Sequence, residues 1–128
     1  MSKPLTGYRI LVIEDEMLIL MSIEDMLADL GCDAVTAAPS VAKALALIDA
    51  QSFDVAMLDA NLGSGSSDAI ADALAARNIP FFFATGYRDY GAGGPHSDRY
   101  VLKKPFQRSD LERSFRQVLS PATLTPGV

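Results

Sequence analysis

The sequence predicts a doubly wound α/β domain, in which a five-stranded parallel sheet carries helices on both faces. Three observations support this prediction. Short apolar runs of strand length alternate with segments whose apolar residues recur every three or four positions. The strand candidates are almost continuously apolar, which is typical of strands covered on both faces. A helical segment follows nearly every run, and such crossovers join parallel strands with a right-handed connection.

The first half of the domain contains two strand–helix units. Residues 8–13 (YRILVI) form the first predicted strand, and the following helix starts at Met17 and stops at Gly31. Residues 33–37 form the second strand, after which a Pro-Ser pair opens the next helix. The predicted inward faces of the two helices are Leu20, Ile23, Leu27 and Leu30 in the first, and Val41, Leu45 and Ile48 in the second.

The next part of the chain repeats this alternation. Residues 53–58 (FDVAML) form a strand that ends at Asp59, and a loop rich in Gly and Ser leads into a helix over 68–78. The aromatic run at 81–84 is the fourth strand. The inward residues predicted for this third helix are Ile70 and Leu74.

The last strand and helix are separated from the fourth strand by a segment of poor helix propensity. Residues 88–98 (RDYGAGGPHSD) hold three glycines and a proline, so a fourth helix is expected to be short or mobile. Residues 100–102 form the fifth strand. Ser109 and Glu112 fit a capping box at the start of the final helix. The inward residues of that helix are Leu111, Phe115 and Val118.

Composition limits the classes of protein to consider. The 128 residues suit one domain over 1–119 with a flexible tail over 120–128. The net charge of −5 and the lack of a Lys/Arg cluster argue against direct binding to nucleic acid. No apolar stretch is long enough to cross a bilayer, so we expect no membrane association and a cytoplasmic location. The single Cys32 is expected to be a small apolar filler without a disulfide.

Polar residues follow the predicted strands at their carboxyl ends. In a doubly wound sheet these ends converge on the ligand site, so acids after the first and third strands would share a crevice with a hydroxyl and a lysine. Two carboxylates at about 4 Å repel by roughly 4 kcal/mol at an effective dielectric of 20, a cost that a divalent cation would offset. The residues in question are Glu14, Asp15 and Glu16 after the first strand, Asp59, Thr85, and Lys103 and Lys104.

This set of groups suits phosphoryl transfer. Oxygen ligation favours Mg²⁺, which commonly combines a few carboxylates with a phosphate. Asp59 is then the candidate nucleophile, since a carboxylate can accept a phosphoryl group. A metal, a lysine and the Thr85 hydroxyl would neutralise the phosphoryl oxygens.

The order and spacing of these residues resemble the response-regulator receiver family of two-component signalling over residues 7–119. The stretches that carry the resemblance are Glu14-Asp15, Leu58-Asp59, Ala84-Thr85-Gly86 and Lys104-Pro105-Phe106. The resemblance implies a flavodoxin-like strand order of 2-1-3-4-5. It implies that Asp59 is the phosphoacceptor and that Thr85 and Lys104 contact the phosphoryl group. It also implies Mg²⁺ (or Mn²⁺) held by Glu14, Asp15, Asp59 and the backbone carbonyl of Asn61.

The run at 80–87 (PFFFATGY) further resembles the FATGUY subgroup of receivers, whose members tend to have a reduced fourth helix. One position departs from common receivers: Val101 stands where an aromatic residue is usual, three positions before Lys104. Tyr87 or Tyr100 would have to replace that aromatic residue in a conformational switch. Both tyrosines could instead serve only in packing, and we expect His96 to be an exposed surface residue.

The resemblance implies a single-domain response regulator rather than an enzyme. Its phosphodonor would be a sensor histidine kinase or a histidine phosphotransfer protein, and its output would go to an unknown downstream protein, or it would act as a phosphate shuttle. One alternative is a receiver-like adaptor that works without phosphorylation. Another is a phosphatase of the haloacid dehalogenase type, but that family needs an acid where this chain has Asn61.

Overall fold

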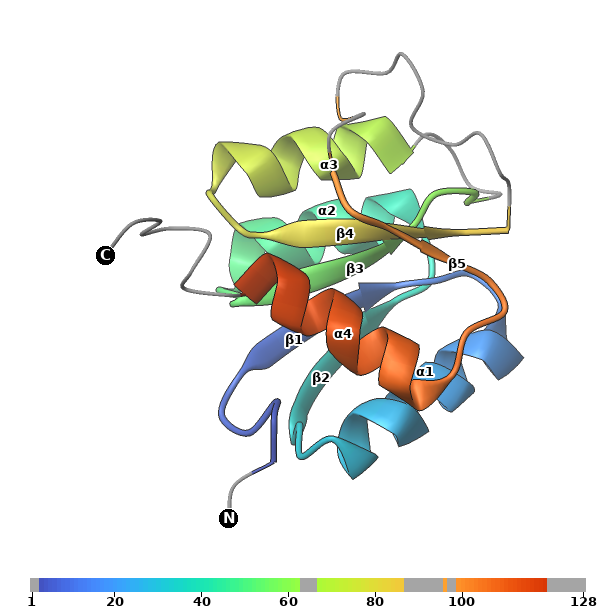
Figure 1. Cartoon of the computed structure of the whole chain (residues 1–128). Coiled ribbons are helices and arrows are strands. Elements are labelled where there is room, and N and C mark those ends of the chain that lie inside the picture. Colours follow the sequence, from blue (N-terminus) through green and yellow to red (C-terminus); the bar gives the residue numbers. More distant parts are fainter. Residues whose placement is uncertain (1–2, 63–66, 87–95, 97–98, 120–128) are drawn as a thin grey trace, which may run out of the picture.

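The computed structural model describes residues 3–62, 67–86, 96 and 99–119. Within this part of the chain, five parallel strands form one sheet in the order β2-β1-β3-β4-β5, with helices on both faces (Figure 1). The predicted fold class and strand order are confirmed. The strands are β1 Arg9–Ile13, β2 Ala34–Ala38, β3 Val55–Asp59, β4 Phe81–Thr85 and β5 Val101–Lys103, and the helices are α1 Met17–Asp29, α2 Val41–Ala50, α3 Ser67–Ala76 and α4 Arg108–Leu119.

The sheet separates two apolar layers. In Figure 1, α1 and α4 lie on one side of the strands, and α2 and α3 lie on the other. Successive strand residues point to opposite faces, so Val12 packs in the α1/α4 layer and Leu11 in the α2/α3 layer. Because both faces are covered, β3 and β4 are buried at every position. This explains why both strands are continuously apolar up to their last residues, Asp59 and Thr85.

Gly31 ends α1 as predicted. Its φ of +94° lies in the left-handed region, where the backbone N–H of Gly31 donates to Ala28 O at 3.0 Å and that of Cys32 donates to Leu27 O at 3.0 Å. A Cβ at position 31 would lie 2.5 Å from Lys3 Cβ. The chain therefore needs glycine here both for backbone conformation and for space. Cys32 is buried, in agreement with its predicted role as a small apolar filler.

The inward face of α2 differs in part from the prediction. Ser40 caps the helix by accepting a hydrogen bond from the Lys43 backbone N–H at 3.2 Å, and Ile48 is buried as expected. Ala44 is the other fully buried residue of α2, whereas Val41 and Leu45 are only half-buried at the edge of the core.

The predicted capping box of the last helix is wrong by two residues. Helix α4 begins at Arg108, so Ser109 lies inside its first turn. The backbone N–H of Gln107 donates to Asp110 Oδ2 at 2.9 Å, which makes Gln107 the capping position and Asp110 its acidic partner. Glu112 instead accepts a hydrogen bond from Arg116 Nε at 2.8 Å on the helix surface.

The prediction that His96 is an exposed surface residue is wrong. Its Nε2 lies 2.8 Å from Asp72 Oδ1 on α3, and its ring packs edge-on against the buried Phe81 at a centroid distance of 5.8 Å. The side chain is mostly covered as a result. The other residues of the segment 88–98, where a reduced fourth helix was predicted, lie outside the described residues. So does the predicted tail over 120–128. No helix among the described residues is long and apolar enough to cross a membrane.

Candidate functional site

The register of the sheet brings the predicted polar residues to one edge. Ile13 at the end of β1 is level with Leu58, and Asp59 at the end of β3 is level with Ala84. Thr85, the last residue of β4, is level with Lys103 of β5. Residues that directly follow these positions therefore share the carboxyl edge of the sheet, where doubly wound folds bind their ligands.

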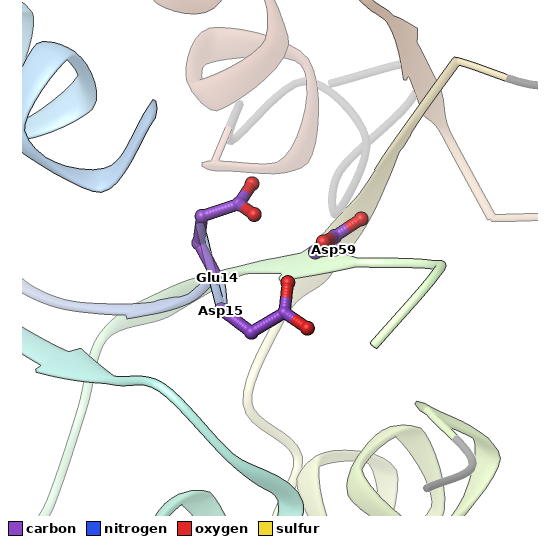
Figure 2. Close-up of side chains that lie close together, drawn as sticks. All are labelled: Glu14, Asp15 and Asp59. Atoms are coloured by element: carbon purple, nitrogen blue, oxygen red, sulfur yellow. The ribbon is translucent and has the colours of Figure 1, made fainter. Parts of the chain in front are cut away.

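Three carboxyl groups meet at this edge. Each of Glu14, Asp15 and Asp59 has a carboxylate oxygen within 4.8 Å of one from the others. Figure 2 shows the three groups gathered at the ends of β1 and β3. Glu14 and Asp59 are almost fully covered, at 1% and 4% exposure, whereas Asp15 is exposed. The cluster thus has one side against the core and one side open to solvent.

Lys104 forms ion pairs with two of these carboxylates. Its Nζ lies 2.9 Å from Glu14 Oε1 and 3.4 Å from Asp59 Oδ1. The peptide bond between Lys104 and Pro105 is cis, and the Lys104 backbone N–H donates to Thr85 O at 2.9 Å. The side chain of Lys103 is exposed by contrast. The structure therefore brings the lysine before the proline, as preferred from the sequence, to the acids.

Backbone donors hold two of the carboxylates in place. The Glu16 N–H donates to Glu14 Oε2 at 3.2 Å, and the Asn61 N–H donates to Asp59 Oδ1 at 3.1 Å. Glu16 itself is exposed at the start of α1, and Asn61 is exposed two residues after β3. Each carboxylate is thus oriented by the chain that immediately follows it.

Burial and ion pairing shift two pKa values at the site. Burial raises the pKa of Glu14 above its ordinary 4.5, and the Asp59 charge adds to this, although hydrogen bonds from Lys104 and the Glu16 backbone act against it. Burial lowers the pKa of Lys104, but the hydrogen bond with Glu14 and the charges of Asp59 and Glu14 outweigh burial and raise the pKa of Lys104 overall. The lysine therefore stays charged at neutral pH.

The donor set fits a hard divalent cation. Glu14, Asp15 and Asp59 offer only oxygen ligands, and the exposed Asp15 leaves room for waters or a further oxygen ligand. Three acids against one nearby lysine leave an excess of negative charge, which a divalent ion would offset. Thr85 is fully buried at the end of β4, next to this edge. Of the predicted residues, Glu14, Asp15, Asp59 and Lys104 are thus brought together at one edge of the sheet.

An apolar surface beside the site was not predicted. Among the described residues, the exposed large apolar side chains are Met17, Leu18 and Met21, all on α1, with Leu18 83% exposed. Leu18 also lines a groove of about 460 Å³, whose other lining residues are Ile19, Ser22, Ile23, Met26, Lys104, Pro105 and Phe106. We call the three exposed side chains together with this groove the α1 apolar patch. The signal in the sequence is the run MLILM, which places apolar residues on the outer face of the helix as well as the inner one.

Comparisons with known proteins agree with this geometry. Residues 10–116 match the response regulator receiver domain family. The phyllosphere-induced regulator PhyR of Methylorubrum extorquens is 30% identical over 114 residues, which cover 86% of this chain and 43% of that protein. This chain therefore spans less than half the length of that curated relative.

Two solved structures extend the comparison. The PhyR receiver domain of Erythrobacter litoralis is 31% identical, with a TM-score of 0.76 over 90% of this chain and 92% of that one. SdrG of Pseudomonas melonis Fr1, in a BeF₃-activated conformation, is 43% identical, with a TM-score of 0.75 over 87% of this chain and 95% of that one. Together with the fold and the acidic edge of the sheet, these matches show that the chain belongs to the response-regulator receiver domain family.

Proposed function

We propose that Asp59 accepts a phosphoryl group from a phosphohistidine, in a reaction that requires Mg²⁺ (or Mn²⁺), and that the resulting aspartyl phosphate controls binding to another protein. The phosphodonor is a sensor histidine kinase or a histidine phosphotransfer protein. The observation that carries this proposal is the position of the nearly buried Asp59 carboxylate between Glu14, Asp15 and the Lys104 ammonium.

Transfer to Asp59 exchanges one bond to phosphorus for another. A carboxylate oxygen of Asp59 bonds to phosphorus, the bond between phosphorus and the donor imidazole breaks, and its electron pair stays on the imidazole nitrogen. The Lys104 ammonium, 3.4 Å from Asp59 Oδ1, offsets the charge that the phosphoryl oxygens bring. Thr85, buried at the end of β4, supplies a hydroxyl to one of those oxygens. Attack by water on the phosphorus later restores the carboxylate and releases inorganic phosphate.

The metal requirement follows from the residues that would hold it. Glu14, Asp15, Asp59 and the backbone carbonyl of Asn61 are the proposed ligands. When bound, the divalent cation would neutralise the carboxylates and the incoming phosphoryl oxygens. The chain supplies the scaffold and the donor supplies the reactive phosphorus, so we propose a phosphoacceptor that assists its own turnover rather than an enzyme acting on other substrates.

The α1 apolar patch supports a protein as the phosphodonor. Lys104 lines the groove of this patch and also contacts Asp59, so a partner seated in the groove would lie next to the phosphoacceptor. An exposed apolar surface of this kind is typical of protein contacts rather than of sites for a small polar phosphate ester. The same surface, or one that changes after phosphorylation, would carry the signal to a downstream protein or pass the phosphoryl group on.

A labelling experiment tests the proposal. Incubation with Mg²⁺ and acetyl phosphate should add one acid-labile phosphoryl group, detected by intact-protein mass spectrometry. Asp59→Asn should abolish the mass gain, as should chelation of the metal, while the exposed Asp33→Asn should leave it unchanged. Labelling of Asp59→Asn at the wild-type level would overturn the assignment. Wild-type behaviour of Asp59→Asn in partner binding would favour the adaptor alternative.

A further inference from the structure

Ser67 is a buried polar residue on an otherwise apolar helix face. It is the first residue of α3 and is only 5% exposed. The other buried residues of this helix follow it at helical spacing and are all apolar: Ile70, Ala71 and Leu74. Alanine at position 67 would have a higher helix propensity and no hydroxyl to satisfy. The Ser67 hydroxyl donates to Ala60 O at 3.3 Å, so one contact that alanine could not make is directed at the residue after Asp59.

The peptide group between Ala60 and Asn61 is held at both of its polar atoms. Its carbonyl oxygen accepts the hydrogen bond from the Ser67 hydroxyl. Its N–H, which belongs to Asn61, donates to Asp59 Oδ1 at 3.1 Å. In a trans peptide the carbonyl oxygen and the N–H point in opposite directions from one rigid plane. A group that holds the oxygen therefore also sets the direction of the N–H.

The chain is anchored on both sides of this peptide group. The Ala60 N–H donates to Ala84 O of β4 at 2.9 Å, and Ser67 belongs to a helix whose inward face packs in the core. Rotation of the peptide plane would weaken the hydrogen bond from Ser67 and the one from Asn61 to Asp59 together. One rigid unit thus connects a hydroxyl on α3 with the carboxylate at the end of β3.

We propose that Ser67 is a positioning residue for phosphoryl acceptance at Asp59. Its hydroxyl aims the Asn61 N–H at the Asp59 carboxylate, and Ser67 itself touches neither the acids nor the phosphoryl group. A backbone donor that is oriented in advance stabilises charge at a reacting group without reorganising during the reaction. This inference rests on the proposed function of Asp59 and adds to it a residue of α3.

The rate of labelling provides the first test. At saturating Mg²⁺, Ser67→Ala should accept a phosphoryl group from acetyl phosphate about fivefold more slowly than wild type, because one orienting hydrogen bond is lost. The matched control is Ser114→Ala on α4, which removes another buried hydroxyl that donates to a backbone carbonyl, Asp110 O, at 2.9 Å. The control should be labelled at the wild-type rate. A wild-type rate for Ser67→Ala, or equal slowing of both variants, would overturn the proposal.

The Asn61 amide resonance separates positioning from a general loss of stability. In ¹⁵N-labelled protein, Asp59→Ala removes the acceptor and should move the Asn61 amide proton upfield, because a hydrogen-bonded amide proton is deshielded. Ser67→Ala should move this proton in the same direction by a smaller amount, and Ser114→Ala should leave it in place. An Asn61 resonance that is identical in wild type and Ser67→Ala would reject the positioning role, even if labelling were slower.

The two measurements distinguish failure of this inference from failure of the proposed function. The Asn61 resonance is recorded without metal or phosphodonor, so it does not depend on phosphorylation. If wild type is labelled but Ser67→Ala changes neither the rate nor the resonance, the positioning role fails and the proposed function stands. If wild type is never labelled but Ser67→Ala moves the resonance, the proposed function fails, and Ser67 is left as the residue that orients the peptide beside Asp59.

Discussion

The Lys104 ammonium lies 2.9 Å from Glu14 Oε1, although the two residues are 90 positions apart in the sequence. Glu14 follows β1 and Lys104 follows β5, and two further strands separate β1 from β5 in the sheet. The two side chains meet over the carboxyl edge of the sheet that lies between those strands. The contact joins residues that follow the first and last strands of the domain into one site. The stability of the protein, its metal binding and its response to pH should therefore depend on this site.

The charge of Asp59 should lower the stability of the metal-free protein. The cluster places three carboxylates around one lysine, so removing a buried charge relieves repulsion. We expect Asp59→Asn to raise the free energy of unfolding by about 1 kcal/mol in chelator, and Tm by a few degrees. Urea and thermal unfolding monitored by circular dichroism measure the change. A fall in stability would mean that the ion pair with Lys104 outweighs the repulsion.

Metal removal should lower stability by an amount that depends on Asp15. A ligand that binds only the folded state stabilises it by about 2.7 kcal/mol when its free concentration is about 100 times Kd. Because Asp15 is exposed, Asp15→Asn should change metal-free stability little while removing most of the increase in Tm that Mg²⁺ produces. Thermal scans of both proteins with Mg²⁺ and with chelator provide the comparison. An equal increase in both would exclude Asp15 as a ligand.

The pH dependence of stability should carry a contribution from Glu14. Because its pKa is raised in the folded state, this group contributes stability that is fully present below its ordinary pKa of 4.5 and is lost as pH rises through the folded-state pKa. Measured in chelator, the free energy of unfolding of wild type should therefore fall relative to that of Glu14→Gln as pH rises from 4.5 toward neutrality. Urea unfolding at several pH values tests this. Parallel curves for the two proteins would contradict it.

Gly31 should tolerate substitution less well than Gly7. Both have positive φ, +94° and +88°, so alanine strains the backbone at either position. Only at position 31 would the new Cβ also meet a neighbour, 2.5 Å from Lys3 Cβ, whereas nothing lies within 4 Å at position 7. We expect Gly7→Ala to cost about 1 kcal/mol and Gly31→Ala about 2 kcal/mol or more in unfolding experiments. Equal costs would show that the N-terminal residues move aside freely.

The rate of phosphotransfer from a protein donor should depend on the α1 apolar patch, whereas the rate of labelling by a small phosphodonor should not. Leu18→Asp places a charge at its most exposed residue and should slow phosphotransfer from the cognate kinase or phosphotransfer protein by about tenfold or more. Labelling by acetyl phosphate should be unchanged. Ala28→Asp, which adds the same charge near the other end of α1 at an exposed position, is the control. If phosphorylation by both donors were slowed equally, the substitution would be acting on the phosphorylation site at Asp59 rather than on binding of the protein donor.

The alternation of strands and helices could be predicted because it depends on local patterns. Continuous apolar runs marked β3 and β4, and the spacing of apolar residues marked α1 to within about a turn. Details that depend on where a helix meets the sheet were less predictable. Ala44 is more deeply buried than Leu45, which packs only at the edge of the core, and Asp110 rather than Glu112 completes the cap of α4, because each depends on the exact start and rotation of a helix.

By itself, the sequence determined the topology of the domain and the group of residues at its carboxyl edge. Acids after β1 and at the end of β3, and a lysine directly after β5, lie at one edge once the parallel strands form a sheet that is covered on both faces, because strand ends in such a sheet converge. Only the tertiary structure decided that Lys104 approaches Glu14 more closely than Asp59, and that Leu18 of α1 lines the same groove as this lysine. Such contacts depend on how far side chains reach across the sheet and on what burial costs each charge, and neither is encoded in local spacing.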